Sequence, residues 1–396
     1  MVTALKWLVG RLLRLIPENL LGRILPGPLH FDAARIPAPP KAPDAPVRLY
    51  VGPVNWAGQG WQWAHAAESN LPGVGAINMA YHGRDAFGFA SDDPVPVGAY
   101  VASRRWQRAQ FAAVRDGFSH VLVEAERQPF GAVLDESVQS QIERLLGSGI
   151  EVAFVCHGSD IRLPSAHADA NPDSPFRAGL LPRTRALERE VRRNRALLDR
   201  MGLPVFVSTP DLLLDVPGAT WLPVVIDNAV WRSAAAPLQQ DIPIVVHAPS
   251  SGPMKGSDLV DPVMRRLDSE GLISYQRVEG IPAADVPALY RHADVVLDQF
   301  RLGDYGVAAC EAMAAGRVVV AHVSEHSREY VRARTGLHLP IVEARAVDLE
   351  AVIRTILADR PKFRRIALEG AEFAAAVHSG ARSAAALAPF LTGVTS

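Results

Sequence analysis

The sequence predicts an α/β protein made of two doubly wound domains. Short apolar runs typical of buried parallel strands alternate along the chain with segments of helical periodicity. Several of these runs lead directly into a glycine-containing loop and a helix, the repeating unit of doubly wound sheets. The chain has 396 residues, more than one ordinary hydrophobic core organises, so two domains are expected.

The composition excludes several classes of protein. Hydrophobic residues make up 48% of the chain and charged residues 21%, which is typical of a folded globular protein. The formal net charge is −1, with 41 basic and 42 acidic residues, and so provides no overall field that would attract a nucleic acid. Cys156 and Cys310 are the only cysteines, which argues against a zinc site or a disulfide framework and favours a reducing cytoplasm. We see no carboxylate pair or histidine cluster that indicates a metal, and expect none.

The N-terminal 25 residues form a basic amphipathic pattern that Pro17 interrupts. Basic residues recur on one face of the expected helix and leucines fill the other, whereas no stretch of eighteen apolar residues is free of charge. One interpretation is a helix that lies on an anionic membrane surface, on the inner face of the membrane. The other is a helix packed against the protein itself or a partner. Residues 27–46, rich in Pro and Ala, predict a stiff linker, so residues 1–46 are set apart from the first domain.

The first domain is expected to span residues 47–228. It begins with a strand at 47–51 and a loop that contains Asn55, Gly58 and Gly60; its glycine spacing does not match a dinucleotide fingerprint. This loop either approaches a substrate or forms a tight connection. Further strands are predicted at 74–79, 120–123, 152–156 and 205–208, helices at 106–115, 136–146 and 183–200, and an irregular loop at 163–180.

The arginine-rich segment 183–200 contains interleaved acidic residues and a leucine stripe, and therefore predicts a solvated helix rather than a nucleic-acid site. Upstream, a polar cluster at 157–162 follows a buried strand. His157, Asp160 and Arg162 would lie at the carboxyl end of that strand, where ligands of α/β proteins bind. Alternatively, Asp160 merely caps the following segment and His157 is a strand-end residue.

The second domain is expected to span residues 241–380, after a short hinge. A strand at 242–247 leads into a Ser- and Gly-rich loop with Lys255, which suits a phosphate as a point-charge contact, although a surface lysine in a turn has the same pattern. The remaining elements are a helix at 258–269, a strand at 273–278, a helix at 282–291 and a final helix at 373–391. The segment 381–396 is predicted to cross back to the first domain.

Residues 294–322 are the most informative stretch. They predict a strand (294–298), a loop with glycines (299–305), a helix of small residues (306–315) and a second strand (318–322). A loop that leads from a strand into a helix aims backbone N–H groups at a phosphate. Glu311 is the single carboxylate on this otherwise small and apolar helix.

The two runs VVHAPSSGPMKGSDL and ADVVLDQFRLGDYGVAACEAMAAGRVVVAHV resemble glycosyltransferases of GT-B fold, most closely the retaining family four, also called group 1. The upstream runs FVCHGSDIR and VSTPDLL are similar to the first domain of the same enzymes. The resemblance covers about residues 47–391. It implies two Rossmann-like domains and transfer of a sugar from a nucleoside diphosphate donor, which is a substrate; no cofactor is implied.

The resemblance also implies roles for individual residues. Lys255 corresponds to the lysine on the donor diphosphate, Glu311 to the glutamate that binds the donor ribose, and His157 to the histidine that faces the transferred sugar; these three are the expected catalytic residues. The expected donor-binding set is Ser250, Ser251, Lys255, Gly303, Asp304, Tyr305, Gly306, Val307 and Glu311. The expected acceptor-side set is Asn55, Gly58, Gly60, Asp160 and Arg162.

Two positions depart from the family pattern. Gly303 stands where the first of two glutamates is expected, with Asp304 adjacent, and no arginine accompanies Lys255 in SSGPM, although Arg301 is a candidate replacement. Two functions therefore stay open: a glycosyltransferase that acts on a glycan or lipid-linked acceptor of the cell envelope, or a catalytically silent module that binds a nucleotide sugar or a partner subunit. A nucleotide-sugar epimerase of the same fold is less favoured by EAMAAG.

Overall fold

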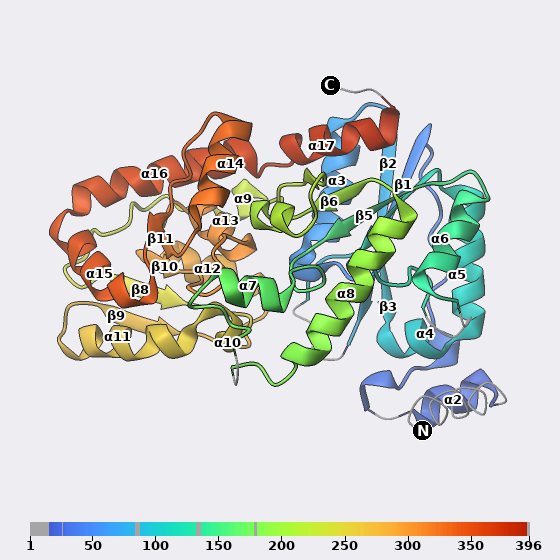
Figure 1. The fold of residues 1–396 in the computed structure, drawn as a ribbon, viewed down its shortest axis with the longest axis horizontal. Coiled ribbons are helices and arrows are strands. Elements are labelled where there is room, and N and C mark those ends of the chain that lie inside the picture. Colours follow the sequence, from blue (N-terminus) through green and yellow to red (C-terminus); the bar gives the residue numbers. More distant parts are fainter. Residues whose placement is uncertain (1–15, 26, 84–87, 132–135, 178–179, 394–396) are drawn as a thin grey trace. The chain divides into compact units, whose positions relative to one another are not determined.

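The computed structural model describes residues 16–25, 27–83, 88–131, 136–177 and 180–393 (Figure 1). The strands form two parallel sheets, of seven strands in the order β3-β2-β1-β4-β5-β6-β7 and of five strands in the order β12-β11-β10-β8-β9. The chain divides into two compact units, Met1–Val155 with Phe390–Thr395, and Cys156–Pro389 with Ser396. The two-sheet α/β architecture predicted from the sequence is confirmed, whereas the predicted domain boundary between 228 and 241 stays a prediction.

The first unit is a parallel α/β sheet whose strand order has a reversal. Strand β1 pairs in parallel with β2 on one side and with β4 on the other. The chain therefore moves outward to β2 and β3 and then returns across β1 to continue with β4, which makes β1 and β4 the point where the strand order reverses. Its strands are β1 (Val47–Gly52), β2 (Val74–His82), β3 (Asp93–Pro96), β4 (His120–Glu124) and β5 (Glu151–Cys156, of which Cys156 begins the second unit).

The helices of the first unit follow from apolar periodicity and caps. Ser103 and Ser137 each accept a hydrogen bond from a backbone N–H in the first turn of a helix, α5 and α6 respectively, and so fix where these helices begin. The elements are α2 (Glu18–Ile24), η1 (Gly27–Leu29), η2 (Ala33–Arg35), η3 (Trp56–Gly58), α3 (Gln59–Asn70), α4 (Val97–Ala102), α5 (Arg104–Gly117) and α6 (Val138–Leu146).

Helix α2 is the described end of the amphipathic segment, and it packs within the first unit. The carboxylate of Glu18 accepts hydrogen bonds from the Ser103 hydroxyl and from the Arg105 backbone N–H, both at 2.8 Å. Leu21 is buried, whereas Leu20 is 51% exposed. For Glu18–Ile24 the contacts therefore match the alternative of a helix packed against its own protein. The membrane interpretation concerns mainly residues 1–15, which lie outside the described residues.

The second unit opens with two helices and two short strands. Asp227 caps α9 through the Ala229 N–H. The elements are α7 (Pro164–Ala170), α8 (Thr184–Met201), β6 (Val205–Val207), η4 (Pro210–Leu214), β7 (Thr220–Trp221) and α9 (Asn228–Trp231).

The five-stranded sheet follows in the same unit. Strand β8 (Ile244–His247) lies between β9 (Ser274–Arg277) and β10 (Val295–Leu297), and β11 (Val318–Ala321) and β12 (Val342–Glu343) continue outward from β10. In chain order this is the arrangement 2-1-3-4-5 of flavodoxin-like sheets, in which the strand order reverses between the first and third strands. That point lies between β8 and β10. The helical elements are α10 (Gly252–Lys255), α11 (Ser257–Ser269), η5 (Ala283–Asp285), α12 (Val286–His292), α13 (Val307–Ala314), α14 (Glu325–Thr335), η6 (Ala346–Asp348), α15 (Leu349–Ala358), α16 (Arg360–Val377) and α17 (Ala381–Thr392).

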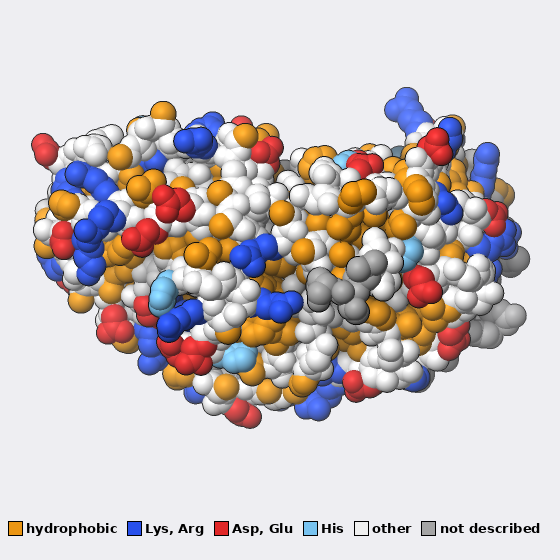
Figure 2. Space-filling view, turned by 90° about the horizontal axis from the view of Figure 1, so that it is seen from above, with side chains coloured by type: hydrophobic (Ala, Val, Ile, Leu, Met, Phe, Trp, Pro, Cys, Tyr) orange, Lys and Arg blue, Asp and Glu red, His pale blue; other side chains and the backbone are white. Residues whose placement is uncertain are grey.

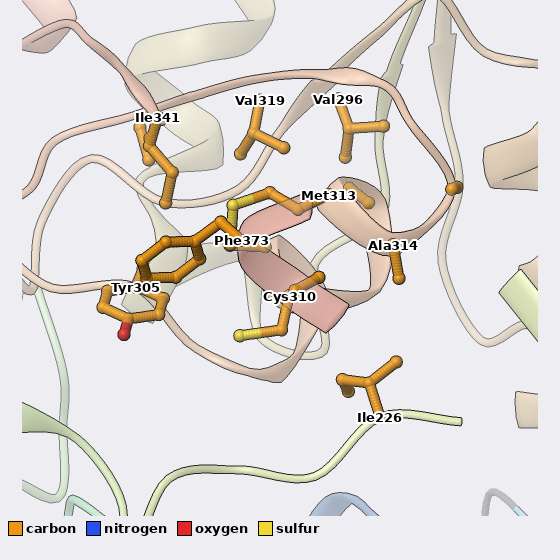
Figure 3. Packing of buried hydrophobic residues seen from close by; sticks show 14 of the residues in the cluster. Ile226, Val296, Tyr305, Cys310, Met313, Ala314, Val319, Ile341 and Phe373 are labelled. Atoms are coloured by element: carbon orange, nitrogen blue, oxygen red, sulfur yellow. The ribbon is translucent and has the colours of Figure 1, made fainter. Parts of the chain in front are cut away.

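Alternate residues of the strands supply two separate cores, one on each face of this sheet. Val246, Val296 and Val319 pack with α13 and the end of α16, whereas Val245, Val295 and Val318 pack with α11 and α15. Figure 3 shows the first of these cores, in which Met313 and Cys310 of α13 lie close to Phe373. Because α13 is rich in alanine, it approaches the sheet and α16 closely.

Two sequence-based predictions of local structure are wrong. The segment expected to be an irregular loop contains α7, which begins with Pro164 at its first position, where proline needs no N–H partner. The single helix expected at 373–391 is two helices, which are separated around Gly380 with φ +103°. The last described residues of α17, Phe390–Thr392, cluster with the first unit, which is the direction of the predicted crossing.

The surface carries both signs of charge. On the face in Figure 2, Lys and Arg side chains are interspersed with Asp and Glu side chains rather than gathered in one region. This distribution agrees with the net charge of −1. Among the described residues, none of the helices has the length and apolar character needed to span a bilayer.

Candidate functional site

The expected donor site lies where the strand order of the five-stranded sheet reverses. The loop after β8 contains Ser250, Ser251 and Lys255, and the loop after β10 contains residues 298–306. Strands β8 and β10 are adjacent and parallel, so their carboxyl ends point to the same edge of the sheet. Ligands of open α/β sheets bind outside the carboxyl ends of the strands at such a point. The topology therefore brings together the two segments that the sequence singled out separately.

Lys255 and Asp298 join these two loops. The Lys255 ammonium forms an ion pair with the Asp298 carboxylate, and the Lys255 carbonyl accepts a hydrogen bond of 3.0 Å from the Phe300 N–H. The Lys255 side chain is 16% exposed and that of Asp298 only 1%. The second carboxylate oxygen of Asp298 has no hydrogen-bond partner among the described residues. Lys255 is therefore held at the site by a buried counter-charge, and it keeps an opening to solvent.

Glu311 belongs to the same group of charges. It lies on the first two turns of α13 and is half-buried. The pKa of its carboxyl group is raised to about 8, first by burial and then by the charge of Asp298, whereas the charge of Lys255 acts in the opposite direction. Lys255, Asp298 and Glu311 thus interact electrostatically, and Glu311 is largely protonated at neutral pH when the site is empty. A protonated carboxyl can both donate to and accept from a sugar hydroxyl.

The N-terminus of α13 completes the site. Gly306 precedes the helix in an extended conformation, a methyl group added there would meet no atom within 4 Å, and no side chain of the described residues caps the helix. Residues 306–308 are partly exposed, whereas Tyr305 is buried. Uncapped N–H groups at a helix N-terminus are suited to an anion. Gly306 and Val307 therefore lie where the resemblance placed the phosphate-holding backbone.

Ser250 and Ser251 have a looser position. Ser250 is exposed, and Ser251 precedes α10, where its carbonyl accepts a hydrogen bond of 3.0 Å from the Lys255 N–H. Neither side chain caps α10. The two serines therefore shape the turn through their backbone, and a direct contact of their hydroxyls with a donor stays a prediction.

Gly303 has a backbone conformation that explains the missing glutamate. Its φ is +76°, a left-handed conformation that a glutamate adopts only under strain. Its carbonyl accepts a hydrogen bond of 2.8 Å from the Ser324 N–H, and the preceding carbonyls of Arg301 and Leu302 accept from Asn171 and His167 at 2.8 and 3.0 Å. The loop is thus fixed through its backbone rather than through an acidic side chain at 303.

Asp304 lies in a buried charge cluster with Asp211 and Arg162. The Arg162 guanidinium binds the Asp211 carboxylate at 2.5 and 3.0 Å, and the Asp304 carboxyl accepts the Asp211 N–H at 2.8 Å and the Tyr305 N–H at 2.7 Å. Burial and the neighbouring Asp211 raise the pKa of Asp304 well above its ordinary value. Burial opposes ionisation of Asp211, but Arg162 and the hydrogen bond from Asp304 outweigh it and lower its pKa to about 2. One proton is thus shared by two carboxyl groups beside one cation.

His157 and Asp160 form a turn at the end of β5. The Asp160 carboxylate accepts the backbone N–H groups of His157 and Gly158 at 2.8 and 2.5 Å, and the Ser208 hydroxyl donates to the His157 carbonyl at 3.0 Å. Asp160 and Arg162 are both buried, and Arg162 binds Asp211. The Asp160 carboxylate thus closes a turn over residues that precede it, and a cap on the following segment stays a prediction. The acceptor-side assignment of Asp160 and Arg162 stays a prediction, as does the role of the His157 side chain.

The glycine loop of the first unit surrounds a buried carboxylate that the sequence did not indicate. Glu124 at the end of β4 accepts the backbone N–H groups of Val54 and Asn55 at 3.1–3.3 Å. A methyl group at Gly60 would lie 2.8 Å from this carboxylate and 2.7 Å from the Asn78 amide, so a side chain there does not fit. Asn55 has φ +51° and Gly58 φ +74°. The loop thus lies at the β1–β4 reversal of the strand order, the position in that unit where a ligand is expected.

The comparisons with solved structures give the same fold over nearly the whole chain. Sucrose-phosphate synthase from Thermosynechococcus elongatus is 14% identical, with a TM-score of 0.55 over 85% of this chain and 96% of that one. Anabaena Alr3699/HepE in complex with UDP-glucose is 12% identical, with a TM-score of 0.55 over 87% and 99%. WaaG, a glycosyltransferase involved in lipopolysaccharide biosynthesis, is 14% identical, with a TM-score of 0.50 over 87% and 100%. A search of curated proteins gives no match.

The fold is therefore the GT-B fold of these solved structures, with two parallel α/β sheets. Residues 266–372 match the family described as glycosyl transferases group 1, and this segment contains the 303–307 loop and Glu311. The match agrees with the resemblance to group 1 that the motif around Glu311 had indicated.

Proposed function

We propose that the protein moves a sugar, with retention of its anomeric configuration, from a nucleoside diphosphate donor to a glycan or lipid-linked acceptor of the cell envelope. The observation that carries the proposal is the grouping of Lys255, Glu311 and the uncapped N-terminus of α13 at one edge of the five-stranded sheet. The donor class is supported by the solved structure of Alr3699/HepE in complex with UDP-glucose, which shares the fold. Retention rests on the resemblance to group 1 enzymes.

The chemistry follows from where charge develops. The bond between the sugar C1 and the diphosphate breaks, a bond from C1 to the acceptor oxygen forms, and the proton of the acceptor hydroxyl passes to the departing diphosphate. Negative charge grows on the leaving diphosphate as the sugar becomes oxocarbenium-like. The Lys255 ammonium and the N–H groups at the start of α13 would stabilise that charge, in the position that a divalent cation takes in other transferases. Removal of such a group typically lowers kcat on the order of 100-fold or more.

Glu311 would bind the ribose of the donor. Its carboxyl is half-buried and lies near the Lys255 and Asp298 charges. A carboxyl group in this position can form hydrogen bonds with both ribose hydroxyls, which orients the nucleotide while Lys255 neutralises the diphosphate. His157 would face the transferred sugar, and Asn55, Gly58 and Gly60 would line the acceptor side.

The decisive experiment is a transfer assay with a panel of UDP-, GDP- and ADP-sugars. The wild-type protein is expected to hydrolyse or transfer from at least one of them, with EDTA present, and Lys255→Ala and Glu311→Ala are expected to lose this activity. Activity of both variants at the wild-type level would contradict the proposal. A wild-type protein that binds a nucleotide sugar without any turnover would favour the second candidate, a catalytically silent binding module. The observation that favours this candidate is the absence of a carboxylate at Gly303.

We further propose that the protein is cytoplasmic and peripheral on the inner face of the membrane. The basic amphipathic composition of the N-terminal segment supports this, and Leu20 and Ile24, on the described helix α2, are exposed apolar side chains. Because α2 is packed within the first unit, the matched test removes residues 1–15 alone. The full chain is expected to float with anionic vesicles and the shortened chain to stay in solution; a full chain that stays in solution would contradict this location, and equal flotation of both chains would exclude residues 1–15 as its cause.

A further inference from the structure

Arg277 of the neighbouring strand β9 lies beside the turn at Gly252, where the glycine leaves space for a side chain. A methyl group at Gly252 would lie 3.2 Å from the terminal Nη2 of Arg277 and 3.3 Å from the hydroxyl of Ser257. Arg277 is the last residue of β9, which pairs with β8. A guanidinium therefore lies against the Ser251–Lys255 turn, in the space that a side chain of residue 252 would begin to occupy.

A chain of hydrogen bonds fixes this guanidinium from the buried side. His247 Nδ1 lies 2.9 Å from the Leu297 carbonyl, which can only accept, so Nδ1 carries the proton. His247 Nε2 then accepts from the Ser257 hydroxyl at 2.9 Å, and Ser257 Oγ accepts from Arg277 Nη1 at 3.0 Å. Burial lowers the pKa of His247 to about 4, and the nearby Arg277 and Lys255 charges add to this, so the imidazole is neutral and the direction of the chain is defined.

The carboxylate that the Arg277 guanidinium binds directly, Glu279, is exposed. Arg277 Nη2 pairs with Glu279, whose side chain is 62% exposed, and Asp261 lies 3.8 Å from Nε. The Arg277 side chain itself is 17% exposed, nearly the same as that of Lys255. An exposed carboxylate on a mobile side chain is a weak partner that another anion can replace.

Arg301 is more deeply buried than Arg277, although the carboxylate that it binds, Asp258, is itself 57% exposed. The Arg301 side chain is 5% exposed, its Nη2 binds Asp258 at 2.7 Å, and its Cγ would lie 3.2 Å from a methyl group at Gly256. Arg301 is thus enclosed beneath the glycine that separates α10 from α11. Its position suits support of the turn rather than contact with a ligand.

We propose that Arg277 is the second cation of the donor diphosphate site. The diphosphate would be bound by Lys255 on one side of the turn and by the Arg277 guanidinium on the other, and it would displace Glu279 from Arg277. This inference rests on the proposed function, because it assigns a residue to the same donor. A planar guanidinium that already donates to Ser257 keeps further N–H groups for phosphate oxygens.

The test is calorimetric titration with UDP, GDP and ADP, and with the matching nucleosides as ligands without phosphate. The nucleoside diphosphate that the wild type binds is expected to bind Arg277→Ala about tenfold or more weakly, because charge-assisted hydrogen bonds to phosphate are lost. Binding of the nucleoside is expected to be unchanged. Arg266→Ala, a charge-matched control at an exposed position of α11, is expected to bind like the wild type.

Glu279→Gln supplies the opposite prediction. Removal of the displaced carboxylate is expected to tighten diphosphate binding by about two- to threefold, whereas a purely structural Arg277–Glu279 pair predicts weaker or unchanged binding. Thermal unfolding of every variant shows whether the fold is kept. Wild-type affinity of Arg277→Ala for the diphosphate would overturn this inference alone, whereas a wild-type protein that binds none of the three diphosphates would overturn the proposed function as well.

Discussion

The ammonium of Lys255 is paired with the buried carboxylate of Asp298, across the two loops that leave the adjacent strands β8 and β10. The pair has a consequence for any anion that binds there. A phosphate must compete with Asp298 for Lys255, or bind while Asp298 remains on the opposite side of the ammonium. The first prediction is therefore that mutation can separate the effect of this ion pair on stability from its effect on activity.

Lys255→Ala is expected to lower the free energy of unfolding by about 3–5 kcal/mol, because it leaves the buried carboxylate of Asp298 without its counter-charge. The double variant Lys255→Ala/Asp298→Asn is expected to recover most of that loss, yet to remain unable to turn over the donor. Urea unfolding and the transfer assay measure the two effects on the same samples. A double variant that is both stable and active would show that Lys255 has no part in catalysis.

Glu311 gives a pH-dependent prediction. Its pKa in the native state is raised to about 8, so between pH 4.5 and 8 the native state binds more protons than the unfolded chain. Stability is therefore expected to decrease as the pH rises through this window. Glu311→Gln is expected to remove that slope and to stabilise the protein at pH 8 by on the order of 1–2 kcal/mol, since partial exposure reduces the full effect of the shift.

Thermal unfolding at pH 5, 7 and 9 measures this effect of Glu311. Glu311→Ala is expected to lose donor turnover, because it removes both hydrogen-bonding atoms, whereas Glu311→Gln can donate and accept like a protonated carboxyl and is expected to keep part of it. An unchanged pH slope in Glu311→Gln would refute the assignment of the raised pKa to this residue.

The Arg162–Asp211–Asp304 cluster predicts two further changes of the free energy of unfolding with pH. The pKa of Asp211 is lowered to about 2, so its contribution is present above about pH 4 and lost as the pH falls toward 2. The pKa of Asp304 is raised, so its contribution is present below the ordinary pKa of an aspartate and is lost as the pH rises through the raised value. Arg162→Met is expected to cost about 3–5 kcal/mol, because two buried carboxyl groups lose their cation.

Asp304→Asn is the matched variant for this cluster. It removes the ionisable group but keeps a donor toward Asp211, and so is expected to cost less than about 1.5 kcal/mol and to remove the loss of stability that ionisation of Asp304 causes. Equilibrium unfolding in urea from pH 4 to 10 compares the two variants. Equal losses of unfolding free energy in Arg162→Met and Asp304→Asn would contradict the claim that Arg162 is the cation that stabilises both carboxyl groups.

Gly60 gives a prediction for the first unit. A methyl group at this position would lie 2.7–2.8 Å from Asn78 and Glu124, so Gly60→Ala must move the glycine loop away from Glu124. We expect a loss of about 1–3 kcal/mol in stability and reduced transfer to acceptor, with donor affinity unchanged. Gly83→Ala is the control, because a methyl group there meets no atom within 4 Å. A Gly60→Ala protein with full transfer activity would exclude this loop from the acceptor side.

The fold and the course of the two glycine-containing loops could be predicted from the sequence, because both depend on local signals, whereas donor binding by these loops stays a prediction. Apolar runs, glycine turns and the alanine-rich stretch around Glu311 mark strands, loops and a closely packed helix directly. The partners of the charged residues could not be predicted, because Asp298, Asp211 and Glu124 reach their partners only through the strand order. The α7 helix was missed since its proline and small polar residues resemble those of a loop.

Gly303 and Arg277 are two positions whose roles depend on the three-dimensional structure and could not be predicted from the local sequence. Gly303 could be recognised as a departure from the family pattern, but its φ of +76° was needed to explain it. Arg277 lies 25 residues beyond Gly252 in the sequence, at the end of a partly exposed strand, and nothing in its local pattern indicated a site. Only the parallel pairing of β8 with β9 places its side chain against the turn.

A crystal structure with a bound nucleotide sugar tests the central claim most directly. Crystals soaked with UDP-, GDP- and ADP-sugars are expected to show the diphosphate of one donor between Lys255 and the N-terminus of α13, with its ribose on Glu311. Donor density elsewhere on the protein, or crystals that bind none of these donors under conditions in which the protein is folded, would contradict the account.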